Sequence, residues 1–307
     1  MKILRFILRK FHLYIVLREA MREGLLNSWK RLRIQRKILK TKPITTAKDG
    51  EIEIRVLTWR KDYINLIWAL KSFYSTSQVD YPLYIHDGGL FESHIRVLLY
   101  HFPQAHIIDK DEADQKVNLF FEQNNLPLSK AYRQSNIATV KLWDYFIMSK
   151  AQRIISIDSD IIFFQKPDLI ISKDIKKNYY NEDLQFAYSM TVEDIEKNFS
   201  LKIPEKINSG LFNVAHDIFN AEQIEQWLKN EQLYQNKWVT EQTLHAMLSA
   251  HHRDGVHLLP KNYIVSTTPG LTDETVCKHY PGFFRPFFFQ EGIPKFYKSP
   301  EFSSIST

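Results

Sequence analysis

Short apolar runs alternate with segments of helical spacing between residues 52 and 108. The first run is interrupted at alternate positions by Glu53 and Arg55, which is the pattern of a strand, and the next segment places Leu66 and Leu70 at helical spacing. The pattern repeats and predicts strands at 52–58, 82–86 and 105–108 and helices at 62–74 and 93–101. This alternation predicts an α/β fold with a doubly wound sheet, whose ligands bind beyond the carboxyl ends of the strands.

The segments around this repeat are less regular. Lys42–Gly50 is largely polar and predicts a linker, whereas residues 112–134 are polar without a clear period. The apolar positions of Asn136–Met148 predict one long helix. An apolar strand then begins at Arg153 and leads directly into Asp158-Ser159-Asp160.

The composition is that of a globular protein. The chain has 307 residues, of which 44% are hydrophobic and 25% charged, so whole-chain disorder is excluded. Its single cysteine, Cys277, excludes an internal disulfide and favours a reducing compartment.

The positive charge is confined to one end of the chain. Residues 1–42 hold 13 basic and two acidic residues, a net charge of +11, whereas the remainder holds 28 basic and 33 acidic residues, a net charge of −5. We therefore expect a basic helical extension at 1–42 and a separate domain at 50–298. A nucleic-acid enzyme would spread positive charge over its binding face, so no nucleic-acid partner is expected.

The first 17 residues mix Ile, Leu and Phe with Lys and Arg. Their longest apolar stretch, Phe11–Leu17, is too short for a membrane span of about 20 residues. Arg9 and Lys10 interrupt the apolar core that a secretory signal needs. We expect an amphipathic helix on an anionic membrane surface, which places the protein in the cytoplasm, peripherally on the inner face of the cell membrane. The alternative is a solvated basic helix that packs on the body or on a partner.

Asp158 and Asp160 carry the candidate chemistry. Alternation along an extended strand would place both carboxylates on the same side, where they repel each other unless a cation binds. Mn²⁺ or Mg²⁺ would take these oxygen ligands and bridge them to a phosphate. The same pattern also arises by chance in loops and caps. It begins the haloacid-dehalogenase phosphatases too, but those have Thr where this chain has Ile162.

A second motif, Lys278-His279-Tyr280-Pro281-Gly282-Phe283-Phe284-Arg285-Pro286-Phe287, stands near the carboxyl end. With Asp-x-Asp, it resembles the glycogenin-like and bacterial lipopolysaccharide galactosyltransferase-like family of retaining glycosyltransferases, which have the GT-A fold and carry His-x-x-Gly-x-x-Lys-Pro-Trp near their end. The resemblance implies that His279 is the third protein ligand of the cation. It also implies that Gly282 allows close backbone approach and that Arg285 pairs with the diphosphate of a sugar nucleotide.

Two further segments resemble the family. Lys141-Leu142 stands where the family has an Arg-Leu pair that contacts the sugar nucleotide; on its own, Lys141 is equally a solvent-facing helix residue. Ile207–Val214 is similar to the family's Phe-Asn-Ser-Gly-Val segment, which implies that Asn208 and Ser209 lie at the sugar and acceptor site. Alternatively, these two residues form a tight turn before a strand.

Thr240-Glu241-Gln242 resembles the family's Asp-Gln pair. The resemblance implies that Gln242 lies near the reacting sugar carbon and that Glu241 binds sugar hydroxyls. In purely structural terms, Thr240 is a helix N-cap with an acid in the first turn. At the end of the first strand, Thr58 and Arg60 are expected to contact a base or a phosphate, although they also suit a simple strand-to-helix turn.

The expected reaction is transfer of a monosaccharide from a nucleoside diphosphate sugar, a UDP-sugar first, to a saccharide or glycolipid acceptor in cell-surface polysaccharide or lipopolysaccharide synthesis. Gln242, Asn208 and Glu241 are the catalytic candidates. Retention by front-face substitution is implied by the resemblance, and no strong nucleophile is evident. The alternatives are a metal-dependent phosphate-ester hydrolase and an inactive sugar-nucleotide-binding protein at the membrane. A phenylalanine cluster at 283–289 is either an acceptor platform or core.

Overall fold

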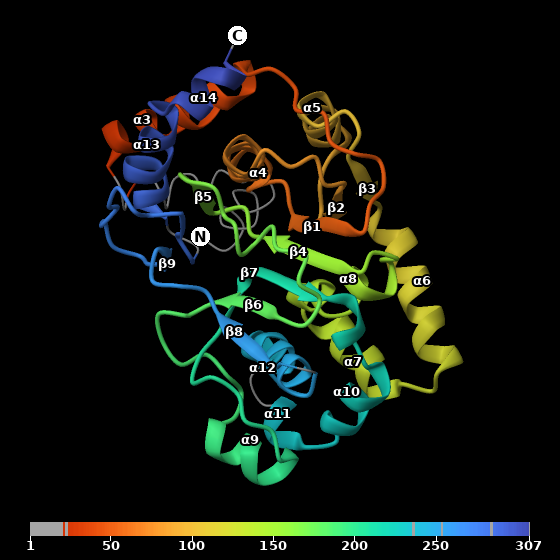
Figure 1. Cartoon of the computed structure of the whole chain (residues 1–307). Coiled ribbons are helices and arrows are strands. Elements are labelled where there is room, and N and C mark those ends of the chain that lie inside the picture. Colours follow the sequence, from red (N-terminus) through yellow and green to blue (C-terminus); the bar gives the residue numbers. More distant parts are fainter. Residues whose placement is uncertain (1–20, 22–23, 235–236, 253, 283–284, 307) are drawn as a thin grey trace.

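The fold is built on a mixed sheet of seven strands (Figure 1). The computed structural model describes residues 21, 24–234, 237–252, 254–282 and 285–306. The strand order is β3-β2-β1-β4-β7-β6-β8, with β7 antiparallel to both neighbours and the first four strands parallel. These strands are β1 (Ile52–Thr58), β2 (Leu83–Asp87), β3 (His106–Ile108), β4 (Arg153–Ile157), β6 (Asn178–Asn181), β7 (Asn208–Ala215) and β8 (Val256–Leu258).

A second sheet of three strands joins distant parts of the chain. It contains β5 (Ile161–Phe163), β9 (Tyr263–Val265) and β10 (Cys277–His279) in the order β5-β10-β9. Because β10 pairs antiparallel with β5, residue 279 lies opposite Ile161. The backbone N–H of Tyr280 also donates to the carbonyl of Asp160 at 3.0 Å. This small sheet therefore brings the carboxyl-terminal motif beside the Asp-x-Asp segment.

Helices cover both faces of the central sheet. On one face, α4 (Tyr63–Ser77) is buried along most of its length, and Trp68 stacks on Phe302 with ring centroids 5.6 Å apart. The other elements on this side are α3 (Leu25–Gln35), the 3₁₀ helix η1 (Arg36–Lys40), α5 (Glu92–His101), the π-helical turn η4 (Phe288–Gly292), α13 (Ile293–Tyr297) and α14 (Pro300–Ile305).

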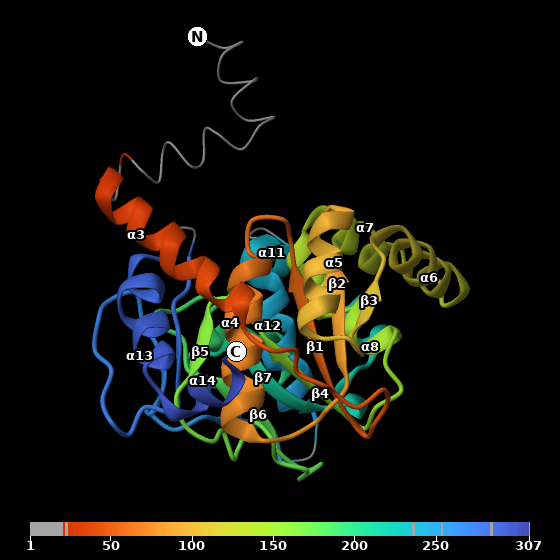
Figure 2. The ribbon, with the colours of Figure 1, turned by 90° about the horizontal axis from the view of Figure 1, so that it is seen from above.

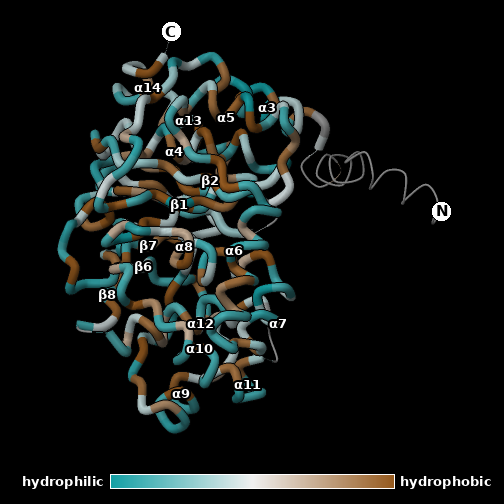
Figure 3. Tube along the Cα trace, turned by 90° about the vertical axis from the view of Figure 1, so that its right-hand side faces the viewer, coloured by the Kyte–Doolittle hydropathy of each residue, from teal (hydrophilic) through white to brown (hydrophobic). Residues whose placement is uncertain are grey.

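The opposite face carries a second core. Ile154 points into it, whereas Ile155 and Ile157 pack on the α4 side, as alternation along a strand requires. Figure 3 shows hydrophobic residues concentrated in the central strands and the helices against them. The elements on this side are α6 (Lys110–Gln123), α7 (Pro127–Ser135), η2 (Ile137–Lys141), α8 (Asp144–Ile147), α9 (Val192–Phe199), η3 (His216–Ile218), α10 (Ala221–Trp227), α11 (Glu231–Tyr234) and α12 (Lys237–Ala250).

The predicted α/β class and the first three strands are confirmed. The long helix predicted at Asn136–Met148 is wrong, because the segment forms the 3₁₀ helix η2 followed by the short helix α8. The Asn136 side chain accepts from the Ala138 N–H, and Thr139 Oγ1 donates back to the Asn136 carbonyl. Such local hydrogen bonds compete with an α-helix. Residues 112–134, which have no clear period, form two helices separated before Pro127.

The second half of the basic extension packs on α4. Ile38 is fully buried in the core, and the Gln35 side chain donates to Asn65 Oδ1 at 2.8 Å. Figure 2 shows α3 projecting from the body. The helix predicted in the first 17 residues lies outside the described residues. In the described part of the chain, no helix has both the length and the apolar content of a membrane span.

Candidate active site

The Asp-x-Asp segment forms a turn between β4 and β5. The buried strand β4 ends at Ile157, and Ser159 and Asp160 then form a turn that leads into β5. The turn is held to β7 because the N–H of Asp158 donates to the Gly210 carbonyl at 2.8 Å. The two carboxylates therefore converge through a turn. We predicted that alternation along one strand would bring them together, and this prediction is wrong.

Asp158, Asp160 and His279 form a cluster suited to a metal ion. One potential ligand atom from each residue lies within 4.8 Å of the others. Asp160 and His279 are only 4% and 3% exposed, and His279 Nε2 lies 3.1 Å from Asp160 Oδ1. The buried Nδ1 atom of His279 has no hydrogen-bond partner among the described residues. Two carboxylates and an imidazole fit Mn²⁺, and the carboxylates also suit Mg²⁺.

Two cations flank this cluster. Arg285 Nε lies 2.9 Å from Asp160 Oδ2, and its Nη1 lies 2.9 Å from Asp62 Oδ1. Lys141 Nζ lies 2.5 Å from Asp158 Oδ1. Lys141 is buried, so the alternative of a solvent-facing side chain is wrong. The predicted site residues from three separate segments thus meet in one place, together with Asp62, which was not predicted.

The cations and the burial set the charge state of the cluster. Burial opposes ionisation of Asp160, but the charges of Arg285 and His279 outweigh it and lower the pKa of Asp160 to about 2. Burial raises the pKa of Asp158, and Lys141 offsets only part of that effect. Burial disfavours the charged form of His279, yet the neighbouring Asp160 raises the pKa of this imidazole overall. A bound cation would replace the proton on His279 and favour the ionised carboxylates.

The strand β7 and the helix α12 meet behind the cluster at Ser209. The Ser209 N–H donates to Gln242 Oε1 at 3.1 Å, and its hydroxyl donates to Glu241 Oε2 at 2.9 Å. Asn208 and Gln242 both donate to Asp183, at 3.0 and 3.3 Å. The three catalytic candidates are therefore held close together by Ser209 and by the unpredicted Asp183.

Two structural alternatives for these segments are wrong. Asn208 and Ser209 are the first residues of β7 and do not form a tight turn before it. Thr240 is the fourth residue of α12, and its hydroxyl donates to the Leu233 carbonyl, so it is not an N-cap. Helix α12 begins at Lys237, one turn before the motif, and this buries Thr240.

Glu241 has a buried neighbour that the motifs did not reveal. His245 Nε2 lies 3.2 Å from Glu241 Oε1, one helical turn away. Tyr180 lies on its other side, with its hydroxyl 3.4 Å from His245 Nδ1 and 2.8 Å from Ser249 Oγ. A polar chain thus extends from Ser249 to Glu241. Its only sequence signal is the spacing of four between Glu241 and His245.

Only glycine fits at position 210 beside the cluster. A Cβ atom at this position would lie 2.5 Å from His279 Cε1 and 2.8 Å from Asp158 Oδ2. Gly282 differs, because a Cβ there would meet nothing within 4 Å, while its φ of 102° is one that side chains rarely adopt. Among the described residues there is therefore no close approach to Gly282, and the predicted role would require a ligand.

A pocket of about 430 Å³ opens at the carboxyl ends of β1 and β4. This volume is within the range of small-molecule sites. Arg60 is not among its lining residues and instead lies over the ring of Phe91, 5.6 Å from its centroid. The lining residues are Leu57, Thr58, Trp59, Lys61, Asp62, Gly88, Ile137, Ala138, Lys141, Asp158, Ser159, Asp160, Trp238 and Arg285.

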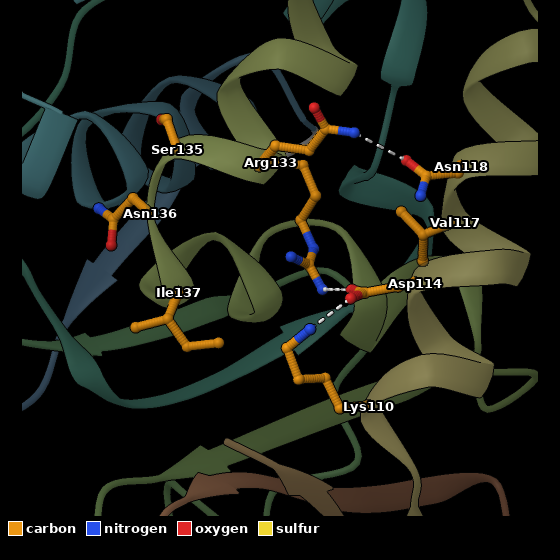
Figure 4. Close-up of a pocket in the computed structure, with 9 residues that line it drawn as sticks. Lys110, Asp114, Val117, Asn118, Arg133, Ser135, Asn136 and Ile137 are labelled. Atoms are coloured by element: carbon orange, nitrogen blue, oxygen red, sulfur yellow. Dashed lines mark hydrogen bonds and ion pairs between the residues drawn. The ribbon is translucent and has the colours of Figure 1, made fainter. Parts of the chain in front are cut away.

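A second pocket, of about 300 Å³, lies between α6 and α7 (Figure 4). Arg133 and Lys110 converge on Asp114, at 3.1 and 2.6 Å, and Arg133 also pairs with Asp144 at 2.6 Å. The charges of this pocket therefore neutralise one another. Ile137 lines both this pocket and the pocket beside the Asp158–Asp160–His279 cluster.

The phenylalanine cluster is largely core. Phe288 is fully buried and contacts Tyr280 edge to face, and Phe287 and Phe289 pack against the same core. Phe288 is therefore not an acceptor platform. Phe283 and Phe284 lie outside the described residues.

Solved structures share this fold, although the sequence matches no protein-family model and no curated protein. The bifunctional glycosyltransferase WbbM superposes with a TM-score of 0.52 at 12% identity, over 85% of this chain and 52% of WbbM. Mouse xyloside xylosyltransferase 1 gives 0.49 at 14% identity, over 77% and 97% of the two chains. The galactosyltransferase LgtC, with donor and acceptor sugar analogues, gives 0.48 at 14% identity, over 83% and 96%. The chain has the GT-A glycosyltransferase fold that its motifs predicted.

Proposed function

We propose that this protein of GT-A fold is a metal-dependent glycosyltransferase. It moves a monosaccharide from a nucleoside diphosphate sugar, with UDP-sugars as first candidates, to a saccharide or glycolipid acceptor. The observation that carries the proposal is the Asp158–Asp160–His279 cluster beside a pocket of about 430 Å³ at the carboxyl ends of the strands. Ligands of such sheets bind at this edge.

Mn²⁺ or Mg²⁺ held by these three residues would neutralise charge on the diphosphate. Arg285 and Lys141 already contact the two carboxylates, at 2.9 and 2.5 Å, so both lie beside any diphosphate bound there. In the proposed reaction, they stabilise the negative charge that develops on the leaving diphosphate. Thr58 and the exposed Trp238 also line the pocket, and we assign Thr58 to the nucleotide.

Gln242, Asn208 and Glu241 are assigned to the transferred sugar. Their amide and carboxylate groups are held around Ser209, whose carbonyl lies 3.4 Å from Lys141 Nζ. This network of hydrogen-bonded polar groups suits the hydroxyls of a sugar. We assign retention of configuration to the transfer because the four motifs resemble those of a retaining family.

A thermal-shift screen of nucleoside diphosphate sugars with Mn²⁺ tests the proposal. Ligands that bind the folded state raise the apparent melting temperature by mass action. In a separate assay of product release, Asp160→Ala should abolish metal-dependent sugar-nucleotide hydrolysis, while Asp168→Ala, which alters an exposed ion pair, should not. Activity of Asp160→Ala within about tenfold of wild type, or about 1.4 kcal/mol in barrier, would remove the assignment.

The reaction products separate this function from its alternatives. A glycosyltransferase releases a nucleoside diphosphate, whereas a phosphate-ester hydrolase acting at the same carboxylates releases free phosphate. An inactive binding protein would respond in the thermal-shift screen without releasing either product. We further assign the acceptor to cell-surface polysaccharide or lipopolysaccharide synthesis on the cytoplasmic side of the membrane, because residues 1–42 are strongly basic.

A further inference from the structure

Helix α3 exposes large apolar side chains to solvent. Leu26 is 77% exposed, Trp29 is 59% exposed and Leu32 is 39% exposed. Lys30, Arg33 and Arg36 are also exposed and lie between or beside them in the sequence. Burying apolar surface is favourable, so a row of three such side chains on one projecting helix indicates a contact surface.

These six side chains, five from α3 and one from Arg36 at its C-cap, lie on one side of the helix axis. At 3.6 residues per turn, they fall within about half of its circumference. The opposite side holds Ser28 and Gln35, which are buried against the body. We call the six exposed residues the α3 face: Leu26, Trp29, Lys30, Leu32, Arg33 and Arg36.

The charge of the α3 face has one sign. Between Gly24 and Lys48 the sequence contains no Asp or Glu. In the described part of the chain, none of Lys30, Arg33 and Arg36 forms an ion pair with a carboxylate. The Arg33 guanidinium lies over the Trp29 ring, 5.4 Å from its centroid, so a cation and an aromatic ring are presented together.

A groove of about 320 Å³ adjoins this face. Lys30, Arg31 and Asn27 line one side of it, and Phe289 and Gln290 line the other. The Arg31 guanidinium lies 5.5 Å from the centroid of the Phe289 ring. Two cations and two side-chain amides suit the oxygens of a phosphodiester.

We propose that the α3 face docks on an anionic phospholipid bilayer and that the adjoining groove receives a lipid phosphate. Leu26, Trp29 and Leu32 enter the boundary between headgroups and acyl chains, while the cations remain at the level of the phosphates. An acidic protein partner would match the charges alone. The apolar side chains between the cations favour the bilayer, which offers an apolar layer directly beneath an anionic one.

Co-sedimentation of the full chain with vesicles tests this proposal independently of any catalytic reaction. The vesicles contain phosphatidylcholine either alone or mixed with phosphatidylglycerol. Wild type should bind the anionic vesicles and bind the neutral ones far more weakly. Combined Lys30→Gln, Arg33→Gln and Arg36→Gln should weaken binding by at least about tenfold, because each cation contributes about as much as a factor of five near an anionic surface.

A variant of equal charge change provides the control. Lys116→Gln, Lys166→Gln and Lys202→Gln together remove three exposed cations elsewhere and should leave vesicle binding within about twofold of wild type, given that only cations close to the surface contribute. A brominated phosphatidylcholine in the anionic vesicles should quench part of the tryptophan emission of the wild-type protein. This quenching should be lost in Trp29→Phe.

Three results would overturn the proposal. Equal loss of binding in both triple variants would mean that only net charge matters. Full binding by the α3 triple variant would place the contact elsewhere in the chain. A change of oligomeric state in that variant, with vesicle binding retained, would identify the α3 face as an interface between copies of this chain.

Discussion

Replacing Gly210 by Ala should weaken metal binding, because the new methyl group would displace two of the proposed metal ligands. The added Cβ would lie 2.5 Å from His279 Cε1 and 2.8 Å from Asp158 Oδ2. Carbon atoms at optimal separation are about 3.5–4.0 Å apart, so the imidazole must move by roughly 1 Å. Metal ligand distances tolerate about 0.2 Å, so this displacement is several times too large.

Two quantities should change in this variant. Overpacking of this kind costs about 1–3 kcal/mol, which should appear as a lower free energy of unfolding in urea with EDTA present. Displaced ligands should lower Mn²⁺ affinity by about tenfold or more, as measured by calorimetric titration without nucleotide. Gly50→Ala is the control, because its Cβ would meet the side chain of Pro82 at 3.3 Å and the Ile52 carbonyl at 3.7 Å, both far from the cluster.

The stability and the Mn²⁺ affinity of Gly210→Ala together test this prediction. Lost stability together with unchanged Mn²⁺ affinity would show that His279 or Asp158 is not a ligand, since the methyl group cannot be accommodated without moving one of them. Unchanged stability and unchanged affinity would show that β7 does not approach the cluster as described.

Three further changes should have measurable effects. The raised pKa of His279 makes protons compete with the metal, so Mn²⁺ affinity should increase as pH rises through that pKa in calorimetric titrations. In metal-free protein, the stability from the His279–Asp160 pair should be complete below the unfolded histidine pKa of about 6.5 and lost as pH rises through the raised value, which urea unfolding at several pH values would detect. Lys141→Gln should lower kcat/KM for the donor by about tenfold or more, with partial recovery in Lys141→Arg; an unchanged value would exclude Lys141 from the diphosphate site. Cys277 is fully buried, and burial raises the pKa of its thiol, so maleimide should label it in urea but not in the native protein; rapid native labelling would contradict this burial.

Local patterns predicted the strands and the order of the motifs. The place of His279 beside the carboxylates was implied by the family resemblance alone. Local patterns predicted neither that contact nor the one at Gly210, because both depend on β4 pairing with β7 and β5 pairing with β10. Asp62 and Asp183 were missed for the same reason, since each meets its partner only through the tertiary fold. At Asn136–Met148, hydrophobic spacing predicted a helix, but hydrogen bonds of polar side chains determined the local structure.

A series of side-chain contacts connects the end of α3 with the Asp158–Asp160–His279 cluster. Gln35 donates to Asn65, Asn65 donates to Asp62, and Asp62 pairs with Arg285, whose guanidinium also contacts Asp160. Nearby, Lys71 is fully buried, with its pKa lowered to about 7 by burial.

The amine of Lys71 is hydrogen-bonded to Thr41 and Lys42, from the end of the same extension. A chain shortened to residue 43 would remove both hydrogen bonds of this amine and the one that Asn65 Oδ1 accepts from Gln35, and it would remove Ile38 from the core. Residues 35–42 are therefore part of the folded domain, and a flexible linker could not replace them. A domain swap or a fusion that replaces the extension must keep residues 35–42, because these residues contact α4, the helix that Asp62 precedes and that carries Asn65.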